Sequence, residues 1–155
     1  MGNSLQKDKR PSSQTWIIVH ILFPLIPFFL AGFIRYIVKD YQINFDTFST
    51  STLAMSIGLI CMLVNQSLLA ANRPLTDSEE LESIHGTATM FFILAIIGFA
   101  FFGILVAFRA LFELNSMPEI KNAECGIGYL TGILSLITIL WAIRAQRCYK
   151  LRARI

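Results

Sequence analysis

Apolar residues gather in four long runs along the chain, and the length of these runs predicts the fold. None of the runs contains Asp, Glu or Lys. A helix needs about 20 mostly apolar residues to cross the roughly 30 Å hydrocarbon layer of a membrane. We therefore predict four membrane-spanning helices, at about residues 16–35, 52–71, 87–109 and 127–144.

The composition agrees with this pattern. Of the 155 residues, 55% are hydrophobic and 15% are charged, whereas soluble domains have about 45–50% apolar and about 25% charged residues. None of the runs has the charged face that a helix in a soluble bundle turns to water. An ordinary water-soluble enzyme is therefore excluded. We expect an all-α integral membrane protein with four transmembrane helices, in a single domain over residues 1–155.

The basic residues predict the orientation. Nine of the thirteen Lys and Arg residues lie in the two tails or in the loop between the second and third runs, and Arg35, Lys39, Arg109 and Lys121 lie at or near the other side. Basic residues that flank spans are retained in the cytoplasm. We therefore expect the N and C termini to be cytoplasmic. An even number of spans agrees with this, because it places both termini on the same side of the membrane.

The segment between the second and third runs is acidic. Thr76 and Glu79 have the spacing of a capping box, and acidic side chains stabilise the amino end of a helix. We expect the third helix to begin near residue 77, in the cytoplasm, and to continue into the membrane. Its acidic residues form either a solvated helix start or a docking surface for a partner: Asp77, Glu79, Glu80 and Glu82.

The first run contains two prolines three residues apart. Pro24 and Pro27 share a helix face with His20 and Arg35. Each proline removes a backbone donor, so we predict a bend in this helix. A static kink is the simpler interpretation, and a hinge or gate is the alternative.

Small and polar residues recur at helical spacing on the second and fourth runs. They are Thr50, Ala54, Gly58, Cys61 and Asn65 on the second run and Gly128, Thr131, Gly132, Ser135, Thr138 and Ala142 on the fourth. Small residues let helices approach closely in a membrane. These faces are predicted to be packing seams between helices, and the alternative is that they line a hydrated pore.

Sequence patterns typical of catalysis or metal binding are absent. No acidic residue lies in the middle of a run, and neither His20 nor His85 has a second ligand at metal-binding spacing. Cys61, Cys125 and Cys148 are expected within the membrane, outside and inside, so they cannot pair within one chain. A phosphate-binding loop and a catalytic triad are also absent. We expect a protein that is not an enzyme and binds no metal or cofactor.

The chain resembles known proteins in its length and in its four apolar runs. It also shares with them an acidic stretch, Asp77 to Glu82, and a basic ending, Arg144 to Arg154. It resembles small membrane subunits of bacterial anti-phage defence systems, with the Kiwa membrane subunit as the nearest. The resemblance covers the whole chain. It implies a multi-pass protein of the bacterial inner membrane and a homo-oligomer, for which we expect a tetramer. Such a subunit would sense disturbance of the envelope during infection and control a DNA-binding cytosolic partner.

Our first hypothesis is a non-enzymatic, oligomeric scaffold or sensor subunit in the lipid bilayer that holds a cytosolic protein at the inner membrane face. We expect no direct nucleic-acid binding by this chain. The residues expected to bind the partner are Asp77, Glu79, Glu80, Glu82, Arg147, Lys150, Arg152 and Arg154. A small oligomeric ion channel or pore is the main alternative, and an assembly factor for a larger complex is the third hypothesis.

Overall fold

The computed structural model describes residues 13–38, 49–70, 78–115, 118–149 and 151, and every regular element among them is helical. Asp77, Lys150, Arg152 and Arg154 lie outside the described residues. The elements are α1 (Ser13–Ile17), the π-helix η1 (Ile18–Leu22), α2 (Phe23–Val38), α3 (Thr50–Leu69), α4 (Ser78–Asn115) and α5 (Pro118–Tyr149).

The predicted set of four long apolar helices is confirmed. The described residues contain four helices that are long and apolar enough to cross a membrane. They are Ser13–Val38, Thr50–Leu69, Leu81–Leu111 and Gly126–Tyr149. The first two lie within three residues of the predicted bounds, whereas the third begins six residues before its predicted start and the fourth ends five residues after its predicted end. The helix that contains the third span, α4, begins at Ser78, next to the start expected near residue 77.

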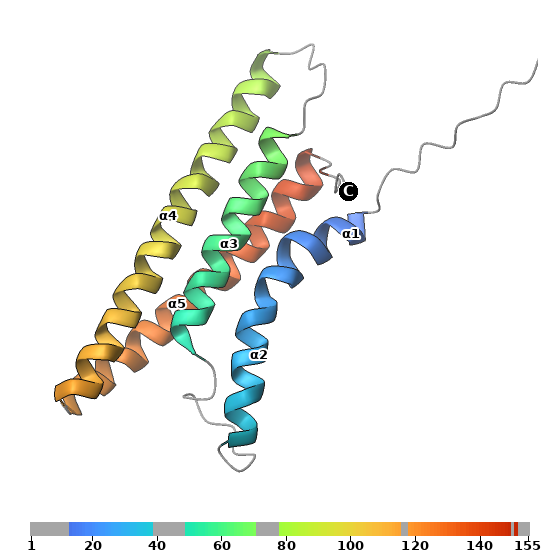
Figure 1. Ribbon diagram of the computed structural model, residues 1–155. Coiled ribbons are helices and arrows are strands. Elements are labelled where there is room, and N and C mark those ends of the chain that lie inside the picture. Colours follow the sequence, from blue (N-terminus) through green and yellow to red (C-terminus); the bar gives the residue numbers. More distant parts are fainter. Residues whose placement is uncertain (1–12, 39–48, 71–77, 116–117, 150, 152–155) are drawn as a thin grey trace, which may run out of the picture.

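The helix α3 lies in the centre of the molecule. It packs against α2, α4 and α5, whereas α4 and α5 have few contacts with each other. Successive long helices run in opposite directions, so that Ser13 and Tyr149 lie at the same end of the molecule (Figure 1). We call this end the terminal end and the other the distal end.

The hydrophobic core occupies the half of the molecule nearest the terminal end. On α3 it extends from Ile57 to Leu68, and on α4 from Ile84 to Ala95. Trp16 and Ile21 of the first span, Ala142 and Ala145 of α5, and Leu151 beyond α5 complete it. The largest fully buried side chains, Trp16 and Phe91 among them, belong to this core.

Most of the outer surface is apolar. Large hydrophobic side chains on all four long helices are exposed, among them Phe23, Phe33, Leu136 and Leu140. Soluble monomers do not expose continuous apolar surfaces of this extent, because water disfavours them. Such a surface is typical of helices surrounded by lipid.

The first span bends where η1 joins α2 (Figure 1), close in sequence to the prolines from which a bend was predicted. The bend follows the π-helix η1, where the backbone N–H of Phe23 donates to the carbonyl oxygen of Ile18, five residues earlier. Pro24 comes next and has no N–H to donate. A π-turn beside a proline lets the chain avoid the clash between the proline ring and the preceding turn.

Candidate functional site

Three sets of polar contacts hold the helices together at the terminal end. In the first, the hydroxyl of Tyr149 in the last turn of α5 lies 2.9 Å from the hydroxyls of both Ser83 and Thr87 on α4. The Thr87 hydroxyl also lies 2.9 Å from the backbone oxygen of Ser83, to which it donates. These bonds fix the end of α5 against the early turns of α4.

The second set joins the beginning of the first span to the end of α5. The side-chain amide of Gln146 donates to the Ser13 hydroxyl at 2.6 Å and to the Leu151 carbonyl oxygen at 3.3 Å. The backbone N–H of Leu151 in turn donates to the Gln146 carbonyl oxygen at 3.1 Å. Gln146 and Leu151 are both buried, so the chain beyond α5 turns back onto the core.

The third set places Trp16 between the first span and α3. Its indole N–H donates to the Ser67 hydroxyl at 2.8 Å, and the side chain is completely buried. The ring of His20 stacks on Trp16 with centroids 4.5 Å apart. Together the three sets tie all four long helices at the terminal end.

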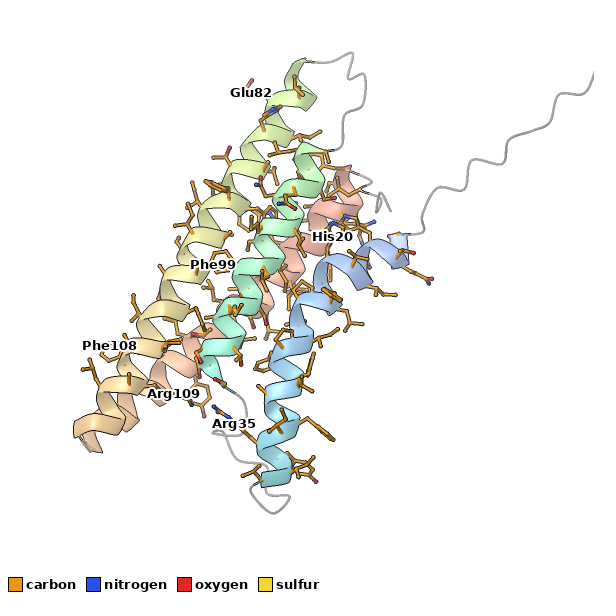
Figure 2. The ribbon with its side chains drawn as sticks, in the orientation of Figure 1. His20, Arg35, Glu82, Phe99, Phe108 and Arg109 are labelled. Atoms are coloured by element: carbon orange, nitrogen blue, oxygen red, sulfur yellow. The ribbon has the colours of Figure 1, made fainter. Side chains whose placement is uncertain are left out.

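The candidate partner-binding residues that the structure describes lie at this same end. Glu82 is exposed on α4 and points away from the other helices, while Arg35 and Arg109 lie at the distal end (Figure 2). Glu79 and Glu80 belong to the first turn of α4. Arg147 is exposed in the last turn of α5. Because Tyr149 contacts Ser83, the structure brings this basic turn next to the acidic start of α4.

The small residues singled out on the second run lie in helix contacts. Ala54 and Gly58 are buried, and Asn65 is half-buried. At Gly58, α3 passes so close to α4 that a Cβ added to Gly98 would lie 3.0 Å from the Cα and N atoms of Gly58. Gly98 was not predicted as a packing residue, because it stands among large apolar residues.

On the fourth run, Ser135 is buried, and Gly128 and Gly132 are half-buried. A Cβ at Gly128 would lie 3.2 Å from the Thr50 hydroxyl oxygen of α3, whereas one at Gly132 would meet nothing within 4 Å. Close packing of α5 on α3 is therefore seen at Gly128 and not at Gly132.

The hydroxyl groups on this face of α5 bond to their own helix. Thr131 donates to the Ile127 carbonyl oxygen at 2.8 Å, and Thr138 to that of Leu134 at 2.9 Å. Ser135 donates to the Gly132 carbonyl oxygen at 2.7 Å. Since all three are buried, this face does not line a water-filled path within one chain.

Between α4 and α5, over α3, lies a small, partly open cleft of ≈ 30 Å³. Its walls are almost entirely apolar and include Ala54, Leu94, Gly98 and Leu134. The cleft holds no charged side chain, so it offers no group for acid–base chemistry.

The residues described by the structure contain no group of three or more His, Cys, Asp or Glu side chains that could hold a metal ion. Comparison with models of known protein families, with curated proteins and with solved structures finds no match to this chain.

Proposed function

We propose that this chain is a non-enzymatic, homo-oligomeric scaffold or sensor subunit of the bacterial inner membrane, which holds a cytosolic protein at the terminal end. The proposal places the terminal end in the cytoplasm, following the distribution of basic residues. The role in anti-phage defence and the DNA-binding character of the partner come from the resemblance to defence subunits.

The observation that carries the docking proposal is the length of α4. It has 38 residues, which at 1.5 Å per residue makes it about 57 Å long. The hydrocarbon layer is about 30 Å thick, so a large part of α4 extends beyond it. The last turn of α5 reaches α4 at Ser83 and Thr87. The residues before Ser83 therefore continue past α5, as Figure 1 shows, and are available to a soluble protein.

At the terminal end, basic and acidic residues lie at two different heights along the helices. Arg144 and Arg147 are exposed on α5, near the level of Tyr149, and basic residues at this depth suit anionic headgroups. Glu79 and Glu80 lie about one turn of α4 beyond Ser83. The acidic first turn of α4 therefore lies farther from the membrane than these basic residues. It favours a partner with a basic surface, because opposite charges speed the association of the two proteins.

The open arrangement of the helices supports the oligomeric part of the proposal. Because α4 and α5 both pack on α3 and have few contacts with each other, their apolar outer surfaces do not close into a bundle. In a membrane such surfaces are available to lipid or to the helices of another copy.

Photo-crosslinking at the acidic start of α4 tests the docking proposal. In the defence systems that the chain resembles, the cytosolic partner is encoded beside the membrane subunit. A photoreactive amino acid at Glu82 should crosslink, in living cells, to a cytosolic protein encoded by the adjacent gene, whereas the same group at Glu113 should not. Glu113 lies near the opposite end of the same helix, so it is a matched control.

A variant that lacks these negative charges tests the docking proposal quantitatively. Replacing Glu79, Glu80 and Glu82 together with Gln should lower recovery of that protein with the purified membrane subunit by about tenfold or more, as expected for lost charge complementarity. The matched control replaces three acidic residues near the distal end: Glu113, Glu119 and Glu124. Equal recovery with both triple variants, or equal crosslinking at both positions, would contradict docking at the start of α4.

A further inference from the structure

We propose that copies of this chain join through two different surfaces, with the outer face of α4 in one copy packed against the outer face of α5 in the next. The inference rests on the oligomeric part of the proposed function and names the surfaces that form the contact. It is independent of any soluble partner.

The outer face of α4 is apolar and exposed, and most of its side chains are small. Ile96 is 54% exposed. Ala100, Gly103 and Ala107 follow at helical spacing, and all three are exposed. Gly98, which packs on α3, lies on the other side of the helix. A Cβ added at Gly103 would meet no described atom within 4 Å, so a second helix has room to approach closely here.

The outer face of α5 is also apolar and exposed, but its side chains are large. Ile133, Ile137 and Leu140 share this face and are 59%, 55% and 67% exposed. The opposite side of α5 carries the buried Ser135 and Thr138. Large side chains on one helix fill the space above small residues on a facing helix, as they do in protein cores. The two outer faces therefore complement each other in shape.

The two outer faces lie at about the same depth. Phe101 of α4 and Leu134 of α5 both line the cleft between these helices, so their neighbours Ala100 and Ile133 are at about one height. Copies in one membrane share the same orientation, and a rotation about the membrane normal relates them without changing these heights. In a neighbouring copy, Ile133 is therefore presented at the height of Ala100.

The charges at the terminal end favour contact between α4 and α5 of two copies. Glu82 lies five turns before Ala100 on the same side of α4, is exposed, and points away from the other helices of its own chain (Figure 2). Arg147 is exposed seven residues after Leu140, on the outer side of α5. Because Tyr149 contacts Ser83 and Thr87, Glu82 and Arg147 differ in height by about one and a half helical turns. Their long side chains can cover this difference.

Pairing of identical faces is disfavoured by the same charges. Two α4 helices related by a twofold axis would place Glu82 against Glu82, and two α5 helices would place Arg147 against Arg147. Contact of α4 with α5 instead brings opposite charges together. Such a contact joins two different surfaces, so repeating it closes into a ring when the rotation between copies divides a full turn.

Crosslinking of cysteine pairs in native membranes tests the interface. The native cysteines are replaced, as Cys61→Ala, Cys125→Ser and Cys148→Ser. A chain that carries both Ala100→Cys and Ile133→Cys is treated with a short bismaleimide crosslinker. It should form covalent dimers and larger species, because each copy offers one thiol to each neighbour.

Three control chains are matched to this pair. Ala100→Cys alone and Ile133→Cys alone should each give at least about tenfold less dimer, since identical faces do not meet. The third control combines Ala100→Cys with Phe29→Cys on α2 and should also give at least about tenfold less. Phe29 is similarly exposed. It follows Trp16 by 13 residues, as Ile133 precedes Tyr149 by 16, so it lies at a similar depth.

Two further variants test shape and charge separately, with the oligomer of the membrane subunit alone as the readout. Gly103→Leu should lower the recovered oligomer by about tenfold or more, whereas Gly103→Ala should leave it in place because the side chain stays small. Glu82→Arg should lower it by about fivefold or more, and the added substitution Arg147→Glu should restore it.

Two results would overturn this interface alone. One is a chain that native mass spectrometry finds oligomeric but that gives no crosslink between positions 100 and 133. The other is crosslinking of Ala100→Cys alone as efficient as that of the pair, which would mean that α4 meets α4. A chain that stays single in membranes would overturn this interface together with the oligomeric part of the proposed function.

Discussion

Gly58 and Gly98 set the distance between α3 and α4. A Cβ on Gly98 would lie 3.0 Å from backbone atoms of Gly58. Backbone atoms cannot move away by a change of rotamer, as a flexible side chain can. Gly58 could be predicted, because Ala54 and Cys61 share its helix face. Gly98 could not, because Leu94 and Phe102 stand four residues away on either side. Only the crossing of the two helices shows that this glycine is required.

Gly98→Ala should lower the free energy of unfolding by about 1–3 kcal/mol, because the added methyl group forces the two helices apart. Gly103→Ala on the same helix is the control, since a Cβ there would meet nothing within 4 Å. Unfolding of both variants in mixed detergent, followed by circular dichroism, measures the difference. If Gly98→Ala were as stable as Gly103→Ala, the described crossing of α3 and α4 would be wrong.

The hydrogen bond from Trp16 to Ser67 should carry a measurable coupling energy. Trp16→Phe removes the indole donor and Ser67→Ala removes the acceptor of the 2.8 Å bond. A double-mutant cycle on unfolding should give about 0.6–1.7 kcal/mol, as for other hydrogen bonds between membrane helices. Fully additive effects of the two substitutions would show that this bond does not hold the start of the first span against α3.

The helix ends show how far sequence reasoning extends at the scale of elements. The predicted starts and ends of the spans follow from where apolar runs give way to charged residues, and the helices agree with most of them. The contact of Tyr149 with Ser83 was not predicted, because 66 residues separate them and nothing local signals the pairing.

Tyr149→Phe should loosen the end of α5 selectively. The substitution removes the hydroxyl that lies 2.9 Å from Ser83 and Thr87 but keeps the ring. Amide hydrogen exchange should become faster in the last turn of α5 and the first turns of α4, as expected for local opening. The distal ends of both helices serve as the internal reference. Uniformly faster exchange, or none, would contradict a local role.

The first span was predicted in part. The prolines predict a bend, because each removes a hydrogen bond from the helix ladder. The form of the bend, a π-helix over Ile18–Leu22, was not predicted. Trp16 and Ile21, before and within this π-helix, are both buried in the hydrophobic core. Such tertiary contacts leave no local trace in the sequence.

At the scale of the molecule, the apolar runs predict the number of helices but not their neighbours. The runs are apolar on all sides, so hydropathy does not say which face of each helix points inward. The central position of α3 became clear only from the packing, although its small residues fit close approach by three other helices. Charge suggested the candidate site, and the exposed Glu82 and Arg147 both lie near the contact of Ser83 with Tyr149 at the terminal end. Binding of a partner by these residues stays a prediction.

The exposed apolar faces of α2, α4 and α5 lead us to expect a homo-oligomer, and by resemblance a tetramer. Native mass spectrometry of the complex released from mild detergent should show one dominant species of about 70 kDa protein mass, four times the 17.5 kDa chain. A dominant single-chain species that persists in several mild detergents and in nanodiscs would contradict the oligomer.

The account depends most on one claim: that the chain crosses the membrane four times with both ends on the cytoplasmic side. Labelling of single-cysteine chains with a membrane-impermeant maleimide in spheroplasts tests it directly. Asn44→Cys and Ser116→Cys, between the paired spans, should react in intact spheroplasts. Ser4→Cys and Ala153→Cys should react only after the membrane is permeabilised. Labelling of Ser4→Cys and Ala153→Cys from different sides of the membrane would contradict the account.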